Sequence, residues 1–258
     1  MQLLLNAGDE CQGSLFYSHY GTAKIAETLN LLDFDAFTIG NHEFDRSDGV
    51  LADFLESLDA PAVSTNIKTA HPALAAQLVP FLVMPEHSLG IVALTTVDTP
   101  DISQPSNLTH FAPLITVQET VDKLLDGRLG GRDAAGAPLV KRVIALTHIG
   151  YEQDQLLAQS TRNISMIVGG HSHTPLGGEA WYSQGPYPTL RTNLDGEEVP
   201  IVQSYRCERP LSVCLRLCSP LITQPGNVSG GASISAASMS HSRPRRADSR
   251  RTPAASCA

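Results

Sequence analysis

The chain has 258 residues, of which 42% are hydrophobic, and it carries a formal net charge of −8. This length supplies enough apolar material for one large domain or two small ones, and one domain followed by a tail fits best. The negative charge argues against general nucleic-acid binding, which requires a basic face to neutralise phosphates. No apolar run approaches the roughly 18 residues of a membrane span, and the first residues lack the basic and apolar regions of a signal peptide.

Two elements are predicted near the start of the chain. An apolar run at residues 3–5 is followed by Asp9, so we expect an early strand with a carboxylate beyond its end. Residues 21–32 carry apolar side chains at helical spacing, at Ile25, Leu29 and Leu32. This period predicts an amphipathic helix that packs on a sheet.

Residues 37–45, Phe-Thr-Ile-Gly-Asn-His-Glu-Phe-Asp, place hydrophobic strand residues directly before a polar cluster. Gly40 permits a sharp change of direction, and Asn41, His42 and Asp45 then stand where the regular strand stops. A carboxamide oxygen can ligate a metal. An imidazole can act as an acid while a carboxylate three residues on holds its other nitrogen. Taken alone, the segment is equally compatible with a surface turn built from Asn, His and Asp.

Strand and helix signals alternate through the middle of the chain. Ser47 or Asp48 can cap a second helix, which Pro61 ends. A further helix is predicted over residues 117–129, where two glycines stop it. Three short β-rich runs lie between these helices, at residues 62–64, 81–84 and 91–95. This alternation is typical of a layered α/β domain.

Two later apolar runs also end in imidazoles. His148 follows the run at residues 143–147, and the stretch Gly-Gly-His-Ser-His, with His171 and His173, follows the run at 164–168. Four separate apolar runs therefore end in a carboxylate, an amide or imidazoles. In open α/β sheets ligands bind beyond the carboxyl ends of the strands, so we expect these groups to converge although they lie far apart in the sequence.

The other cysteines and histidines lack this setting. The cysteines show none of the paired spacings of a structural zinc site, and Cys11 is predicted to be a small buried residue. The histidines at positions 19, 71, 87, 110 and 241 do not follow predicted strands and are left out of the site. From about residue 221 the composition changes to Ser, Gly, Ala, Pro and Arg, which predicts a domain at 1–219 and a disordered tail at 220–258.

Four motifs, in this order, carry a family resemblance: Gly-Asp-Glu-Cys-Gln-Gly-Ser at residues 8–14, Gly-Asn-His-Glu-Phe-Asp at 40–45, Thr-His-Ile-Gly-Tyr at 147–151 and Gly-Gly-His-Ser-His-Thr at 169–174. They resemble the calcineurin-like metallophosphoesterases, and within these the chain is most similar to the 5'-nucleotidase family. The resemblance implies an α/β fold, a four-layer metallophosphatase sandwich of two mixed β-sheets flanked by helices. It also implies that a strand ending in Asp-x-His precedes the Gly-Asp motif. Because Met1 falls just before that motif, we expect the fold here to lack its first strand.

The resemblance assigns metal-binding roles to the residues at the strand ends. Asp9 would bridge two divalent ions such as Mn²⁺, Zn²⁺ or Co²⁺. Asn41, His148 and His171 would complete the second metal site, whereas His173 would serve the first. Without an Asp-x-His pair the first site keeps only Asp9 and His173, so we expect one tight metal site.

The resemblance also implies that His42 and Asp45 form a catalytic dyad. The expected activity is divalent-metal-dependent hydrolysis of phosphoesters, acting on nucleotides or related small phosphate esters and impaired by loss of the Asp-x-His pair. The alternative is a non-catalytic truncated remnant that binds at most one metal tightly. The family is commonly exported to the periplasm or outside the cell, whereas this chain shows no signal peptide, so its location is left open.

Overall fold

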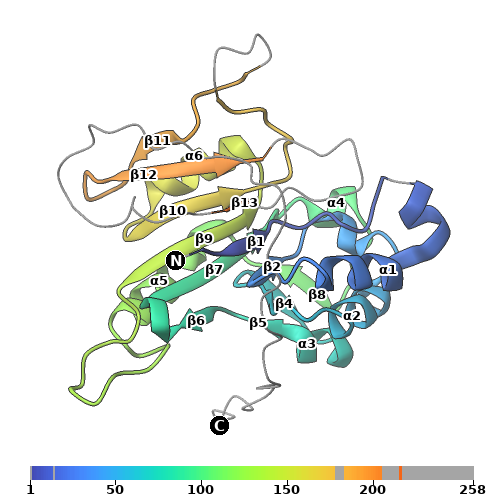
Figure 1. Ribbon diagram of the computed structural model, residues 1–258, viewed down its shortest axis with the longest axis horizontal. Coiled ribbons are helices and arrows are strands. Elements are labelled where there is room, and N and C mark those ends of the chain that lie inside the picture. The colour runs from blue at the N-terminus through green and yellow to red at the C-terminus, as the bar shows by residue number, and fades with distance from the viewer. Residues whose placement is uncertain (1, 14, 178–182, 205–214, 217–258) are drawn as a thin grey trace.

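The computed structural model describes residues 2–13, 15–177 and 183–204, and the backbone of residues 215–216. Two β-sheets pack face to face, and helices cover their outer sides (Figure 1). A separate two-stranded sheet pairs β4 (Ile67–Thr69) with β8 (Thr109–Phe111). Within the described residues, none of the helices is both long and apolar enough to cross a lipid bilayer.

The first sheet has the strand order β13-β1-β2-β3-β5. Its strands are β1 (Leu4–Asn6), β2 (Ala36–Thr38), β3 (Ala62–Val63), β5 (Leu78–Val79) and β13 (Leu215–Arg216). Neighbouring strands from β1 to β5 are parallel, while β13 runs antiparallel to β1. The carboxyl ends of β1 and β2 therefore lie side by side at one edge of this sheet.

The second sheet has the strand order β11-β12-β10-β9-β7-β6. Its strands are β6 (Leu82–Met84), β7 (Leu89–Thr95), β9 (Arg142–His148), β10 (Ile164–Gly169), β11 (Thr189–Thr192) and β12 (Glu198–Gln203). The four inner strands are parallel and the two outer strands, β6 and β11, are antiparallel to their neighbours. Both sheets are thus mixed, as expected.

The helices divide between the outer faces of the two sheets. The first sheet is covered by α1 (Leu15–Asn30), α2 (Asp48–Glu56) and α3 (Pro72–Gln77), and the second by α5 (Val117–Leu125) and α6 (Tyr151–Ser160). The shorter elements are η1 (His42–Phe44), η2 (Pro85–His87), α4 (Thr99–Ile102) and η3 (Leu114–Thr116). Ser47 begins α2, since its hydroxyl accepts the Val50 N–H at 3.3 Å.

Alternation along the strands produces the layers. In β2, Ala36 faces the core between the sheets, whereas Phe37 packs on the helices of the first sheet. In β9, Ile144 and Leu146 face the core between the sheets, whereas Ala145 packs against α5 and α6. Successive strand residues point to opposite faces, so each sheet has two buried faces. The result is four layers, helices–sheet–sheet–helices, which confirms the predicted sandwich.

Several element bounds differ from the prediction. The first helix begins at Leu15 and bends at Gly21, whose φ of 70° and ψ of −169° are not helical. The sequence did not predict its first turns. Leu15 and Tyr20 are apolar but exposed, so the apolar residues there do not repeat at the spacing of an amphipathic helix. Helix α2 ends at Glu56 rather than near Pro61, and α5 ends at Leu125. The predicted tail at 220–258, with its boundary at 219, lies outside the described residues.

We expect Leu146→Ala to lower the free energy of unfolding by about 2–5 kcal/mol, because it leaves a cavity in the layer between the two sheets. Leu146 is 0% exposed there. The matched control is Leu31→Ala, at a side chain that is 82% exposed, where a change below about 0.5 kcal/mol is expected. Urea unfolding of the two variants measures both values. Equal losses would show that the inner layer does not stabilise the fold.

Candidate metal centre

Strand ends from both sheets meet at one place. His148 ends β9, and its Nδ1 lies 2.6 Å from the carbonyl oxygen of Ala7, directly beyond β1. Thr95 ends β7, and its hydroxyl donates to the Ile39 carbonyl, directly beyond β2, at 2.5 Å. The loops that carry the polar motifs of the first sheet therefore face those of the second.

Three side chains converge at this junction. Ligand atoms of Asp9, His148 and His171 all lie within 4.8 Å of one another. Asp9 Oδ2 is 2.9 Å from His148 Nε2, and the rings of His148 and His171 have centroids 5.0 Å apart. Carboxylate oxygen and imidazole nitrogen form the ligand set that Zn²⁺, Mn²⁺ and similar ions accept.

The hydrogen bonding of His148 shows why this junction suits a cation. Because Nδ1–H donates to the Ala7 carbonyl, Nε2 of the neutral ring carries a lone pair. The 2.9 Å contact of Nε2 with Asp9 Oδ2 lacks hydrogen-bond geometry, and Nε2 has no hydrogen-bond partner among the described residues. Ligands of one ion, at bond lengths of about 2.0–2.2 Å, lie roughly 3–3.5 Å apart, with the shorter separations at octahedral angles. The spacing therefore suits two ligands of a shared ion.

The electrostatics of the cluster favour the metal-binding forms of Asp9 and His171, whereas a bound ion would have to displace a proton from His148. Burial opposes the ionisation of Asp9, but the facing His148 and the backbone N–H of His42 outweigh it and lower the pKa of Asp9 to about 2. Burial would lower the pKa of His148, but the charge of Asp9 outweighs it and raises that pKa. Burial and the neighbouring His148 lower the pKa of His171. An ionised carboxylate and a neutral imidazole are the forms that bind metals.

Asn41 supplies a further oxygen without a partner among the described residues. Its side chain is 2% exposed, and Oδ1 accepts no hydrogen bond from that part of the chain. It lies between Gly40, which closely approaches Asp9, and His42, whose N–H donates to Asp9 Oδ1 at 2.9 Å. Buried carbonyl oxygens are almost always satisfied, and a metal ion beside Asp9 would satisfy this one.

Strained backbone marks the same residues. Asp9, His171 and His173 have φ of 67°, 78° and 50°, in the left-handed region that favours glycine. Such residues cost on the order of 1–3 kcal/mol each and cluster at functional sites. The loops after β1 and β2 also approach each other very closely. A Cβ added at Gly8 would lie only 2.5 Å from the Gly40 nitrogen.

Glu43 holds the Asp9 loop in place, and the sequence analysis did not identify it. Its buried carboxylate accepts four backbone N–H groups, from Gly40 at 2.6 Å, Asp9 at 2.9 Å, Glu10 at 2.6 Å and Cys11 at 3.2 Å. Burial and the charge of Asp9 raise the pKa of Glu43 to about 7, while the N–H donors favour its ionised form. One signal was available in the sequence. Glu43 is the polar residue of the motif at 40–45 that received no role, whereas Asn41, His42 and Asp45 each received one.

Gln203 holds the loop that carries His171 in the same way. Its Nε2 donates to the Gly170 carbonyl at 2.8 Å, and its Oε1 accepts the Thr174 N–H at 2.6 Å and the Ser172 hydroxyl at 3.2 Å. The side chain is 3% exposed at the end of β12. This carboxamide therefore bonds to both ends of the turn at residues 170–174. The sequence did not indicate this role.

His42 and Asp45 form a hydrogen-bonded pair beside the cluster. His42 Nδ1 lies 2.8 Å from Asp45 Oδ2, and the three-residue period of η1 brings the two side chains to one side. His173, in contrast, is exposed and does not belong to the group formed by Asp9, His148 and His171. Cys11 is buried, as predicted.

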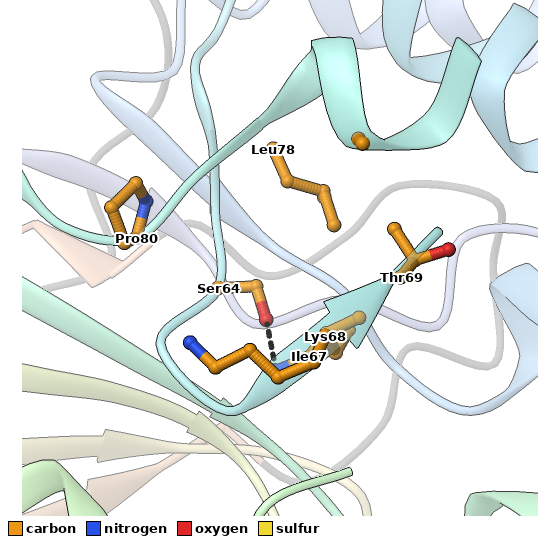
Figure 2. Close-up of a pocket in the computed structure, with 7 residues that line it drawn as sticks. Ser64, Ile67, Lys68, Thr69, Leu78 and Pro80 are labelled. Atoms are coloured by element: carbon orange, nitrogen blue, oxygen red, sulfur yellow. Dashed lines mark hydrogen bonds between the residues drawn. The ribbon is translucent and has the colours of Figure 1, made fainter. Parts of the chain in front are cut away.

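A separate hollow of about 260 Å³ lies beside β4 (Figure 2). It is lined by Ser64, Ile67, Lys68, Thr69, Ala75, Leu78 and Pro80. This lining contains neither a carboxylate nor an imidazole, so it offers no ligand set for a divalent metal. The candidate site is therefore the junction of strand ends and not this hollow.

Asp154 of α6 reaches the ends of β9 and β10 near the cluster. It is 0% exposed, its Oδ1 accepts the Thr147 hydroxyl at 2.6 Å, and its Oδ2 has no hydrogen-bond partner among the described residues. A Cβ at Gly169 would lie 2.1 Å from that oxygen, so only glycine fits there. Burial raises the pKa of Asp154 to about 7.

Comparison with known proteins gives a consistent match. The calcineurin-like phosphoesterase family matches residues 2–175. Human 5'-nucleotidase is 37% identical over 217 residues, covering 79% of this chain and 35% of the human protein, and the rat protein is 36% identical with the same coverage. The chain thus spans about a third of the length of these curated relatives.

Two solved structures share the fold over this region. The 5'-nucleotidase precursor of Thermus thermophilus has a TM-score of 0.69 and 36% identity, covering 79% of this chain and 39% of that chain. The NAD nucleotidase of Haemophilus influenzae has a TM-score of 0.70 and 27% identity, covering 79% of this chain and 36% of that chain.

Replacing Glu43 with Gln tests the role of its carboxylate. An amide NH₂ group cannot accept the backbone N–H groups, so we expect unfolding free energy to fall by about 1–3 kcal/mol. We also expect Mn²⁺ affinity to fall by about 10–100-fold, which is the usual effect of removing a residue that orients a metal ligand. Urea unfolding and calorimetric titration measure these effects. Glu56→Gln, the same change at an exposed residue, is the control and should alter neither.

Asp154 predicts a specific pH dependence. A folded-state pKa of about 7 against an ordinary value of 3.8 means that the folded chain keeps a proton that the unfolded chain has lost. Its contribution to stability therefore falls as pH rises from about 4 to about 7. Relative to Asp154→Asn, the wild type should lose about 2 kcal/mol between pH 5 and pH 7 in urea unfolding. The exposed Asp53→Asn control should track the wild type; parallel curves for all three proteins would refute the assignment.

Proposed function

This chain belongs to the calcineurin-like phosphoesterase family, and from that premise we propose that it is a divalent-metal-dependent phosphoester hydrolase of the 5'-nucleotidase type. The observation that carries the proposal is the convergence of Asp9, His148 and His171, together with the buried Asn41 oxygen that has no partner among the described residues. Relatives described as 5'-nucleotidases and as an NAD nucleotidase support nucleotides, or related small phosphate esters, as substrates.

Asp9, Asn41, His148 and His171 are the residues proposed to hold one divalent ion. Two imidazole nitrogens with carboxylate and carboxamide oxygens suit Mn²⁺, Zn²⁺ or Co²⁺. The family resemblance offers a second ion only Asp9 and His173 among the described residues, and two ligands are too few for tight binding. When bound, such ions polarise phosphoryl oxygens and lower the pKa of water.

The chain's own residues fix the geometry around the substrate. The Ala7 carbonyl orients the His148 ring, which leaves Nε2 toward the cluster. The His42 N–H donates to Asp9 Oδ1, which directs the carboxylate into the cluster. Ligands held in this way need no reorganisation when the reaction begins.

His42 is proposed to act on the phosphate or the leaving oxygen. Asp45 accepts the Nδ1–H, which leaves Nε2 available to the phosphate or the leaving oxygen. When protonated, the ring can neutralise negative charge on the phosphate or give a proton to the leaving oxygen. Its side chain is 25% exposed, so a substrate can reach it.

The second candidate is a non-catalytic protein that binds one metal. The position of His173 favours it. This residue lies outside the group of Asp9, His148 and His171, which is the ligand cluster found among the described residues and offers a site for one ion. The two candidates share the tight metal site and differ in whether hydrolysis follows.

We expect calorimetric titration of the chain with Mn²⁺ to show one tight site, and the loaded chain to hydrolyse AMP and p-nitrophenyl phosphate. His42→Ala should reduce the rate by about 10²–10⁴-fold, as expected for loss of an acid–base group, and leave Mn²⁺ binding intact. The control is His110→Ala, at an exposed histidine of β8 outside the site. One bound ion without turnover would favour the non-catalytic candidate. Absence of tight binding would overturn both.

A further inference from the structure

Asp45 has two carboxylate oxygens, and each has a separate partner. Oδ2 lies 2.8 Å from His42 Nδ1, while Oδ1 accepts the Ser103 hydroxyl at 2.9 Å. The Asp45 and His42 side chains are 31% and 25% exposed, so water can reach both. A carboxylate held through one oxygen has a broad χ2 torsion, whereas bonds to both oxygens fix the plane of the group.

Ser103 reaches Asp45 from the other half of the molecule. It follows α4, in the connection that leaves β7 of the second sheet, and its N–H donates to the Thr99 carbonyl at 2.9 Å. Asp45 follows η1, in the connection that leaves β2 of the first sheet. The hydroxyl therefore joins a loop of the second sheet to the turn that carries the His42–Asp45 pair.

A second carboxylate anchors the same loop. Asp48, which is 1% exposed at the start of α2, accepts the Ser106 N–H at 2.8 Å, the Ser106 hydroxyl at 2.6 Å and the Thr109 hydroxyl at 2.5 Å. These bonds hold the segment between α4 and β8 in place whether or not Ser103 bonds to Asp45. The Ser103 hydroxyl is consequently presented at a fixed place and is not needed to hold the loop.

We propose that Ser103 is a positioning residue for the His42–Asp45 pair. Its hydroxyl fixes the Asp45 carboxylate so that Oδ2 stays directed at Nδ1, which keeps His42 in the tautomer with hydrogen on Nδ1. The kinetic consequence rests on the proposed hydrolysis, whereas the tautomer does not. Without the hydroxyl, the carboxylate plane turns, and His42 loses a constant orientation.

The test compares Ser103→Ala with Ser103→Thr and Ser106→Ala. Ser103→Thr keeps the hydroxyl, and Ser106→Ala removes a hydroxyl from the same loop that bonds to Asp48 instead of Asp45. The ring nitrogens of His42 are observed by ¹⁵N NMR in the full chain loaded with diamagnetic Zn²⁺, at a pH of about 8, above the ordinary pKa of imidazole. Turnover of AMP is measured in parallel with Mn²⁺.

In the wild type, Ser103→Thr and Ser106→Ala we expect a single His42 tautomer with the hydrogen on Nδ1. Ser103→Ala should show a mixture of tautomers and about a tenfold lower kcat, with KM unchanged and a melting temperature no lower than that of Ser106→Ala. A wild-type spectrum for Ser103→Ala, or the same tautomer mixture in Ser106→Ala, would overturn the proposal. If the wild type hydrolyses nothing, the proposed function fails, and the nitrogen spectra alone decide the role of Ser103.

Discussion

The buried imidazole of His148 is the constraint on which the rest of the site depends, because it joins the two sheets. One nitrogen contacts the Ala7 carbonyl beyond β1, and the other faces Asp9. The ring is 1% exposed, so a slide of one sheet along the other would leave a buried polar group without partners. Apolar side chains between the sheets, including Leu5 and Leu146, set the distance that these contacts require.

Two buried side chains keep the site loops in backbone conformations that they would not otherwise adopt. Glu43 gathers the N–H groups of the Asp9 loop, and Gln203 bonds to both ends of the turn that carries His171. Their hydrogen bonds offset the left-handed backbone at Asp9 and His171. The ligand atoms are therefore placed by the folded chain before any ion binds, which is how preorganised metal sites are built.

The sequence predicted the parts of the fold that depend on local pattern. Apolar runs that end in polar residues located the ends of β2, β9 and β10, and the spacing of His42 and Asp45 predicted their contact, which the structure contains. The alternation of strands and helices, with the family resemblance, predicted the four layers. Short strands such as β5, with two residues, have no period to detect.

Residues that act through distant backbone groups could not be predicted. Three of the four N–H groups that Glu43 accepts are more than 30 positions away, and Ser103 bonds to a carboxylate 58 positions away, so local spacing reveals the role of neither residue. His173 was placed with the metals through the resemblance, and its role stays a prediction. The left-handed φ of His171 turns the chain between the two histidines, which spacing alone does not reveal.

We propose that Asp9, Asn41, His148 and His171 bind one divalent ion at the junction of the two sheets. The most direct measurement is an anomalous difference map from crystals of the chain grown with Mn²⁺, recorded at the manganese absorption edge. We expect the strongest peak within about 2.0–2.3 Å of ligand atoms from these four side chains. A map with no peak at this junction, or with its strongest peak at other residues, would contradict the account.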